Sequence, residues 1–334
     1  DKGQKIGSDD ADASSVLDPA RYGPNTEAVF PMSPLQQGLV FHTELEGNSG
    51  VYVNQQRIRL GGTVDIALLR SVWEAALARH DVLRVRFSVT DQVQIVEKQV
   101  TLPWCEFDWS DLSSAAYTEQ RREWDAQDRQ QPFDLTQAPL MRIAVFRGPG
   151  QSVDMVWTAH HAITDGWGSA ALLAEIVSDY EARHAGRVST FPATPSLRDL
   201  MTWRASQPDP QAWWQERLEE RHDPVVLTEA LARPEGKGYG FRTITQILDD
   251  KLTRDVPTAA ARYGTTPSVL MQAAWGLLLA RMGGRSEVAF GVTVSGRPPE
   301  LSGAERMPGL MINTLPLWID IPPEERIAAW IHRL

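Results

Sequence analysis

Apolar residues recur at helical spacing in several stretches of the chain. The clearest repeat lies between residues 63 and 81, with its apolar positions at Ile66, Leu69, Val72, Trp73, Ala76 and Leu77. Spacings of three and four residues place such side chains on one face of a helix. We also expect helices from Pro34 onward, with Ser33 as N-cap, and over 168–186, 197–220 and 322–334.

The stretch 266–282 is expected to form a helix of another kind. Thr266 can cap it and Pro267 suits its first turn, where the missing N–H has no helical partner. Its residues are apolar nearly all round. A helix without a polar face is typical of the protein interior, so this helix is predicted to be buried.

Other stretches have the period of strands. Residues 82–89 and 92–100 alternate between apolar and polar side chains, which predicts a hairpin. Further strands are expected over 153–160, 241–248, 287–294 and 309–321, the second of them after a charged, glycine-rich loop at 232–240.

This mixture of elements predicts an α/β protein with two lobes. Residues 1–24 are polar and acidic and are interpreted as a flexible tail. A Pro- and Thr-containing segment at 186–196 is a natural boundary, which gives an N-terminal lobe over 25–186 and a second lobe over 187–334. A length of 334 residues is comfortable for two domains.

Composition narrows the functional classes. The net charge of −10 and the lack of any Lys or Arg block argue against a nucleic-acid binder. The single cysteine, Cys105, fits a reducing compartment. The longest apolar run is too short to span a bilayer. We therefore expect a cytoplasmic protein without membrane contact, monomeric as an isolated domain.

Two adjacent histidines, His160 and His161, end the strand expected over 153–160. Side chains alternate between faces along a strand, so these imidazoles diverge and do not act as a pair. One is expected to be the working group and the other a structural support. Asp165 follows past a turn and can orient a histidine or pair with an arginine such as Arg84 or Arg86. Divergent histidines disfavour a metal site, so none is assigned.

The segment "HHAITDGWG" resembles the HHxxxDG motif of condensation domains from nonribosomal peptide synthetases. "MSPLQQGLVFH" and "RHDVLRVRF" are similar to the first two motifs of that family, and "GVTVSGRPPELSGAERMPGLMINTLPL" to a later one. The resemblance spans residues 25–334. Family members normally continue beyond such a segment, so the second lobe is expected to be incomplete.

The resemblance implies two lobes like those of chloramphenicol acetyltransferase, forming a V around a tunnel. Peptidyl carrier proteins upstream and downstream supply thioesters on phosphopantetheine arms, no cofactor is bound covalently, and an adenylation domain is adjacent. The reaction is attack of an acceptor α-amine on a donor thioester. By resemblance His161 is the working residue, while His160 and Asp165 hold the loop, Gly166 keeps the tunnel passable and Trp167 packs beside it. Ser295 and Asn313 lie in tunnel-facing segments of similar domains.

Other functions fit the sequence less well. An epimerisation domain shares the motif but needs a Glu-Gly-His pattern where this chain has "VSGRPPE". A heterocyclising variant would have DxxxxD. A non-catalytic recruitment platform has degenerate histidines, and a free-standing CoA-dependent acyltransferase remains a further alternative. "MSPLQQGLVFH" is more similar to domains that take a D-configured donor residue than to those that join two L residues.

Overall fold

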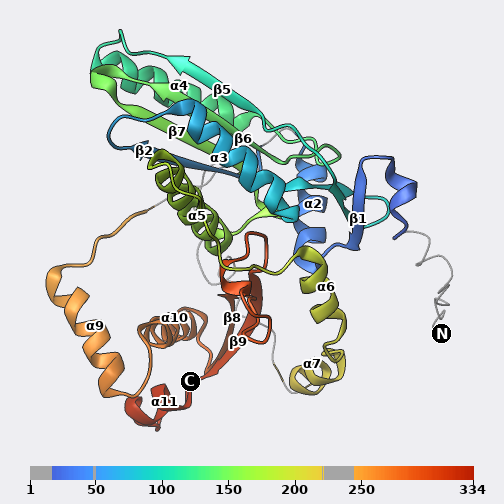
Figure 1. Ribbon diagram of the computed structural model, residues 1–334. Coiled ribbons are helices and arrows are strands. Elements are labelled where there is room, and N and C mark those ends of the chain that lie inside the picture. Colours follow the sequence, from blue (N-terminus) through green and yellow to red (C-terminus); the bar gives the residue numbers. More distant parts are fainter. Residues whose placement is uncertain (1–16, 48–49, 220, 222–243) are drawn as a thin grey trace. The chain divides into compact units, whose positions relative to one another are not determined.

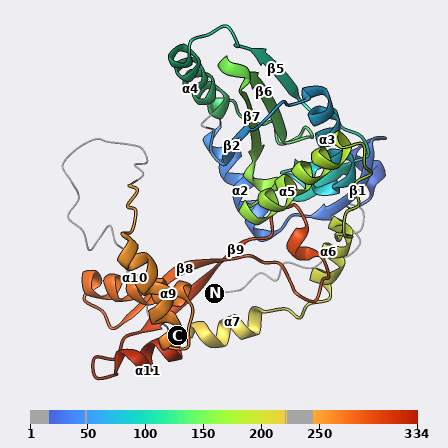
Figure 2. The same cartoon turned by 60° about the vertical axis from the view of Figure 1, so that its left-hand side comes forward.

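The computed structural model describes residues 17–47, 50–219, 221 and 244–334. Its contacts divide the chain into two compact units. The first contains residues up to 207 together with 295–313, and the second contains 208–294 together with 314–334. This division differs from the expected one, because the boundary lies near residue 207 and the segment 295–313 belongs with the N-terminal part. Elements and their labels appear in Figures 1 and 2.

The described residues of the first unit form two sheets. One is a three-stranded antiparallel sheet with the order β1-β4-β3, formed by β1 (Thr26–Pro31), β4 (Val93–Glu97) and β3 (Val85–Ser88). The other has the order β2-β7-β6-β5, formed by β2 (Val53–Leu60), β7 (Val153–His160), β6 (Met141–Arg147) and β5 (Trp104–Asp108). In this sheet only the β5–β6 pair is parallel. The predicted hairpin is confirmed as β3 and β4.

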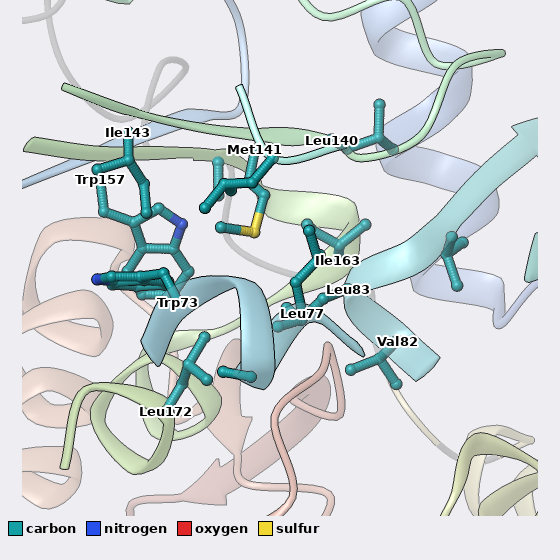
Figure 3. Packing of buried hydrophobic residues seen from close by; sticks show 14 of the residues in the cluster. Trp73, Leu77, Val82, Leu83, Leu140, Met141, Ile143, Trp157, Ile163 and Leu172 are labelled. Carbon is teal, nitrogen blue, oxygen red and sulfur yellow. The ribbon is translucent and has the colours of Figure 1, made fainter. Parts of the chain in front are cut away.

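Helices cover both faces of the four-stranded sheet (Figure 2). On one face lie α3 (Ile66–Arg79) and α5 (Gly166–His184), and on the other lies α4 (Ser114–Gln130). The six apolar positions predicted for α3 are all buried. Figure 3 shows Trp73 of α3 against Trp157 of β7, with ring centroids 5.3 Å apart, and Leu172 of α5 nearby. Because successive side chains of β7 point to opposite faces of the sheet, every second residue of this strand enters this core.

The described part of the first unit also contains two further helices and several short 3₁₀ turns. They are the helices α2 (Pro34–Glu46) and α6 (Leu197–Ala205) and the short 3₁₀ turns η1 (Pro19–Tyr22), η2 (Asp81–Arg84), η3 (Pro149–Gln151), η4 (His161–Ile163) and η5 (Ala304–Arg306). Ser33 caps α2, as the sequence predicts, and it also forms a capping box with Gln36.

The second unit is smaller. It contains α7 (Gln211–Leu218), α9 (Asp250–Arg262), α10 (Pro267–Gly283), α11 (Ile327–Arg333) and a two-stranded sheet of β8 (Glu287–Val294) and β9 (Asn313–Asp320). Thr266 caps α10 and Pro267 opens it, as predicted. The core of this unit joins α10 and α11 to the sheet through residues such as Leu279, Ile319 and Trp330.

Three expectations about local structure are wrong, two for the second unit and one for the N-terminal tail. Helix α10 is not fully buried, because Met271, Trp275 and Leu278 are 60%, 43% and 48% exposed; among the described residues, its packing partners lie on the opposite face. Residues 244–248 form no strand, while 241–243 and the loop at 232–240 lie outside the described residues. Of the expected tail, 1–16 also lie outside them, but 19–22 form η1, where Tyr22 donates a hydrogen bond to Asp91.

Candidate active site

The motif residues lie where β7 gives way to helix α5. The strand ends at His160, residues 161–163 make one 3₁₀ turn, and Asp165 caps α5 by accepting a hydrogen bond from the Gly168 N–H at 2.7 Å. The chain therefore turns immediately after His160. The two histidines diverge because the strand ends between them.

His160 is fully buried and has hydrogen-bond partners on both ring nitrogens. Its Nδ1 accepts from the Ala162 N–H at 3.2 Å, and its Nε2 lies 3.0 Å from Thr43 Oγ1. Thr43 Oγ1 in turn donates to the Leu39 carbonyl. Because Nδ1 is an acceptor, the neutral ring carries its proton on Nε2 and donates it to Thr43.

Burial keeps the His160 ring neutral. Desolvation is the main cause that lowers its pKa to about 4, and an electrostatic contribution from the neighbouring His161 ring adds to the effect. A neutral ring can hold the Ala162 N–H and the Thr43 hydroxyl at the same time. His160 therefore fixes the backbone of the turn that carries His161.

His161 has a different environment and is only partly buried. Its Nδ1 lies 2.8 Å from the Thr164 carbonyl oxygen, so Nδ1–H is the donor and the neutral ring leaves Nε2 as an acceptor. Its backbone N–H is held by the Tyr52 carbonyl at 2.8 Å. Among the described residues no hydrogen-bond partner occupies Nε2. This nitrogen can accept a proton from a substrate group.

Asp165 is buried and receives hydrogen bonds from two distant parts of the sequence. Arg297 Nη1 and Nη2 lie 2.9 Å and 3.0 Å from its two carboxylate oxygens. The backbone N–H groups of Met311 and Ile312 donate to Oδ2 at 2.9 Å and 3.0 Å. Burial alone would raise the pKa of Asp165, but these hydrogen bonds and the Arg297 charge hold it below its ordinary value.

The arginines suggested as partners of Asp165 lie elsewhere, so that expectation is wrong. Arg84 contacts Glu27 and the Glu97 carbonyl, and Arg86 contacts the Glu97 side chain and the Tyr22 carbonyl. Arg84 is the last residue of η2, and Arg86 lies on β3, an edge strand of the three-stranded sheet. Asp165 pairs instead with Arg297, which sequence reasoning missed. The sequence signal that pointed toward such a partner was Asp165 itself, because an acid buried in a motif loop requires a cation. The spacing of the arginines along the chain could not show which of them is that cation.

Two glycines permit close backbone approaches around this ion pair, Gly168 between the motif loop and the segment 295–313 and Gly296 within that segment. A Cβ added at Gly168 would lie 2.8 Å from the Gly309 nitrogen and 3.1 Å from Arg297 Nη2. Gly296, with a φ of 61°, would overlap the Met311 carbonyl if it carried a side chain. Glycine is therefore required on both sides of the Asp165–Arg297 pair.

The remaining predicted residues differ in their surroundings. A Cβ at Gly166 would meet no atom within 4 Å, so its role in keeping a passage open stays a prediction. Trp167 is 51% exposed. The Ser295 carbonyl accepts from Arg297 Nη1 at 3.2 Å, which makes Ser295 a neighbour of the ion pair. Asn313 is exposed at the start of β9 and lines a pocket of the first unit.

Two further findings concern the described residues alone. They contain no group of three or more histidine, cysteine or acidic side chains arranged to hold a metal ion. None of their helices has the length and apolar character needed to cross a membrane.

Residues 26–334 match the model of the condensation-domain family. The chain belongs to that family. The resemblance to condensation domains is thereby confirmed, and with it the prediction of an acyltransferase domain of the nonribosomal peptide synthetase type. One of the linear gramicidin synthase proteins of Brevibacillus parabrevis is 33% identical over 317 residues, and one of the mycosubtilin synthase proteins of Bacillus subtilis is 30% identical over 307 residues.

The condensation domain spans only a small part of these relatives. The match covers 93% of this chain and 6% of the gramicidin synthase protein, and 90% of this chain and 12% of the mycosubtilin synthase protein. The relatives are therefore much larger proteins that contain a similar segment.

Solved structures share the fold. The first condensation domain of the calcium-dependent antibiotic synthetase, in complex with substrate analogue 2a, has a TM-score of 0.71 at 23% identity, covering 91% of this chain and 72% of its own. A mutant starter condensation domain of rhizomide synthetase, in complex with C8-CoA and Leu-SNAC, has a TM-score of 0.72 at 22% identity, covering 98% of this chain and 72% of its own. The predicted chloramphenicol acetyltransferase-like α/β fold is confirmed by this likeness.

Proposed function

We propose that this domain forms a peptide bond between a donor peptidyl or aminoacyl thioester and the α-amine of an acceptor aminoacyl thioester. Both substrates are held on carrier proteins by phosphopantetheine arms. The observation that carries the proposal is the state of His161, whose Nδ1–H is engaged by the Thr164 carbonyl while Nε2 remains an acceptor. Membership of the condensation-domain family supports the reaction class.

The proposed reaction moves the acyl group from the thioester sulfur to the amine nitrogen without any change of oxidation state. The amine nitrogen attacks the thioester carbonyl carbon, the new C–N bond forms, and the C–S bond breaks. One proton leaves the amine and one is taken up by the departing thiolate, so no net oxidation or added reactant is needed. An α-amine has a pKa of about 7.7–8.0, and much of it is therefore neutral near pH 7.5.

His161 serves this step through one nitrogen. Nε2 accepts a hydrogen bond from the attacking amine, takes its proton as the C–N bond forms, and returns it to the sulfur. A positioned base of this kind contributes about 10²–10⁴-fold to the rate. Holding the two thioesters together contributes further, because orientation alone is worth about 7–11 kcal/mol in favourable cases.

The chain's other motif residues act through this histidine. His160 holds the Ala162 N–H, directly after His161, and Asp165 anchors the end of the same turn to Arg297. They are positioning residues, since neither offers a free polar atom of its side chain among the described contacts. We propose that upstream and downstream carrier proteins present the substrates and that an adenylation domain loads one of them, as the multimodular relatives suggest.

We further propose that the donor residue is D-configured, on the first motif "MSPLQQGLVFH". In the structure this segment forms the capped N-terminus of α2, and Gln36 donates a hydrogen bond to the Ala162 carbonyl. Differences in this motif can therefore reach the backbone directly after His161.

The test supplies one donor carrier and one acceptor carrier, each loaded, and follows the acyl group by mass spectrometry. The unsubstituted domain is expected to transfer the acyl group, with faster transfer from a D-configured donor than from its L isomer. His161→Ala is expected to lower the rate about 10²–10⁴-fold. His184→Ala, a change of an exposed histidine at the end of α5, is the matched control and should transfer normally.

Other outcomes favour the alternatives. Inversion at the donor α-carbon without transfer would identify an epimerisation domain. Carrier binding without any turnover would favour a recruitment platform. Equal rates for His161→Ala and His184→Ala would remove His161 from the mechanism, and equal rates for D and L donors would remove the donor assignment.

A further inference from the structure

Tyr52 has a backbone conformation that is unusual for an aromatic residue. Its φ is 59°, which lies in the left-handed region. Among the described residues other than glycine, only Gln92 and Gln151 share a positive φ, and both lie in exposed turns. A bulky side chain disfavours the left-handed region, so such a conformation persists only where the surrounding contacts impose it. The contacts of Tyr52 lead directly to the motif loop.

The Tyr52 carbonyl is the group through which the segment before β2 reaches His161. The register of the sheet pairs Val53 with His160, so Tyr52 lies opposite His161. The Tyr52 carbonyl accepts a hydrogen bond from the His161 N–H at 2.8 Å. Within the described contacts, no other group outside the motif loop binds the backbone of His161. The position of this carbonyl therefore limits where the imidazole can lie.

Two other hydrogen bonds hold the turn one residue later. His160 Nδ1 accepts from the Ala162 N–H, and the Gln36 amide donates to the Ala162 carbonyl. These bonds fix Ala162, whereas the N–H of His161 itself is bound by Tyr52. Tyr52 thus supplies a separate point of support for the histidine.

The turn that contains Tyr52 is fixed on both sides. Gly50 has a φ of 69°, and a Cβ added there would lie 2.5 Å from the Arg129 carbonyl oxygen near the end of α4. The Gly50 carbonyl accepts from the N–H of Val53, the first residue of β2, at 3.3 Å. A change of φ at Tyr52 must therefore be taken up by the peptide group between Tyr52 and Val53. The oxygen of that peptide group is the one that binds His161.

We propose that Tyr52 is a positioning residue for His161 and that its left-handed backbone, rather than its phenol ring, directs the carbonyl that holds this histidine. The inference rests on the proposed function, because the reaction uses the Nε2 atom of the same residue. A displaced His161 backbone would carry Nε2 away from the attacking amine.

The test uses variants that remove the phenol alike but differ in backbone preference. Asparagine adopts the left-handed region readily, whereas β-branched valine disfavours it and alanine lies between them. Hydrogen exchange of the His161 amide, followed by nuclear magnetic resonance, reports the hydrogen bond to Tyr52 without any turnover. Exchange should be slow in Tyr52→Asn, faster in Tyr52→Ala and at least about 10-fold faster in Tyr52→Val than in Tyr52→Asn, because one net hydrogen bond is worth about that factor.

The acyl-transfer assay with loaded carriers measures the consequence for the reaction. We expect kcat to fall at least about 10-fold in Tyr52→Val and to be retained in Tyr52→Asn, because a small displacement of a positioned group from the reacting atoms costs such factors. KM for both carriers should stay unchanged, since the base moves and the carrier contacts do not. Near-ultraviolet circular dichroism checks that each variant is folded.

Gln151→Asn and Gln151→Val are the matched controls. Gln151 has a φ of 61° and precedes β7, at the end of the strand opposite to His161. The same pair of substitutions therefore changes the backbone preference at a remote left-handed residue. Both controls should leave the exchange of the His161 amide and kcat unchanged.

Two outcomes would overturn the proposal. If folded Tyr52→Val and Tyr52→Ala both exchange the His161 amide as slowly as Tyr52→Asn, the Tyr52 backbone does not position this histidine. If Tyr52→Asn exchanges it as fast as Tyr52→Val, the effect belongs to the phenol ring and not to the backbone. Tyr52→Ala decides the first point where Tyr52→Val does not fold.

The exchange measurement needs no turnover, so the result separates this proposal from the proposed function. Absence of acyl transfer by the unsubstituted domain, together with the expected order of exchange rates, would refute the proposed reaction and support the role of the Tyr52 carbonyl. Acyl transfer with equal exchange rates and equal kcat in all variants would do the reverse.

Discussion

Arg297 and Asp165 form a two-pronged ion pair with N–O distances of 2.9 Å and 3.0 Å, although 132 residues separate them in the chain. The two side chains are 4% and 0% exposed. The pair ties the first turn of α5 to the segment 295–313. The Arg297 guanidinium also donates to the Met307 and Gly309 carbonyls, so the same side chain binds the backbone of this segment at two further residues.

Removal of the arginine is expected to be costly. Arg297→Met leaves a buried carboxylate without its cation, which typically destabilises a protein by about 3–5 kcal/mol. Urea denaturation measures this loss. Arg306→Met, on the same segment but exposed, is the control and should change stability by less than about 0.5 kcal/mol. Similar losses in the two variants would show that the ion pair does not hold the segment.

Gly168 and Gly166 provide a matched pair of substitutions two residues apart. A Cβ at Gly168 would press on the Gly309 backbone, whereas a Cβ at Gly166 would meet nothing within 4 Å. Gly168→Ala is therefore expected to lower the unfolding free energy by about 1–3 kcal/mol. Gly166→Ala should be neutral or slightly stabilising, since alanine suits a helix better than glycine. Thermal denaturation distinguishes them, and equal melting temperatures would contradict the prediction.

Thr43 is expected to stabilise the protein through His160. Thr43→Val removes the acceptor of the His160 Nε2–H and leaves a buried donor unpaired, at a cost of about 1–3 kcal/mol. Thr43→Ser keeps the hydroxyl and should recover most of the stability. Thr118→Val is the control, because the Thr118 hydroxyl bonds its own helix at an exposed position. If chemical denaturation showed the same loss of stability for Thr43→Val as for Thr118→Val, the hydrogen bond between Thr43 and His160 would not stabilise the protein.

The buried His160 imidazole predicts a specific pH dependence. Its pKa falls from an ordinary 6.5 to about 4 on folding, so between these values the unfolded chain binds more protons than the folded one. The stabilising contribution is therefore complete above pH 6.5 and is lost as the pH falls toward 4, a difference of about 3 kcal/mol.

Two measurements check this dependence. Denaturation at several pH values should give a flatter profile between pH 6.5 and 4 for His160→Asn than for the unsubstituted protein, because asparagine does not titrate. Nuclear magnetic resonance of the His160 ring should show a midpoint near pH 4. A midpoint near 6.5 would mean that the ring is solvated in the folded protein.

The sequence determined the features that depend on neighbouring residues. The buried face of α3, the caps at Ser33 and Thr266, the β3–β4 hairpin and the end of β7 before a helix all follow from patterns within a few positions. The family motif around His160 and His161 is equally local. Such patterns can be recognised in the sequence because the helix and strand periods repeat within a few residues.

Only the tertiary structure decided which distant groups meet. No spacing in the chain selects Arg297 over Arg84 as the partner of Asp165, or Thr43 as the partner of His160. The same limit explains why α10 was expected to be buried, since apolar side chains all round a helix do not reveal how many of its faces find a partner. Local composition determines which elements form, whereas pairing and burial depend on long-range packing that the linear pattern does not encode.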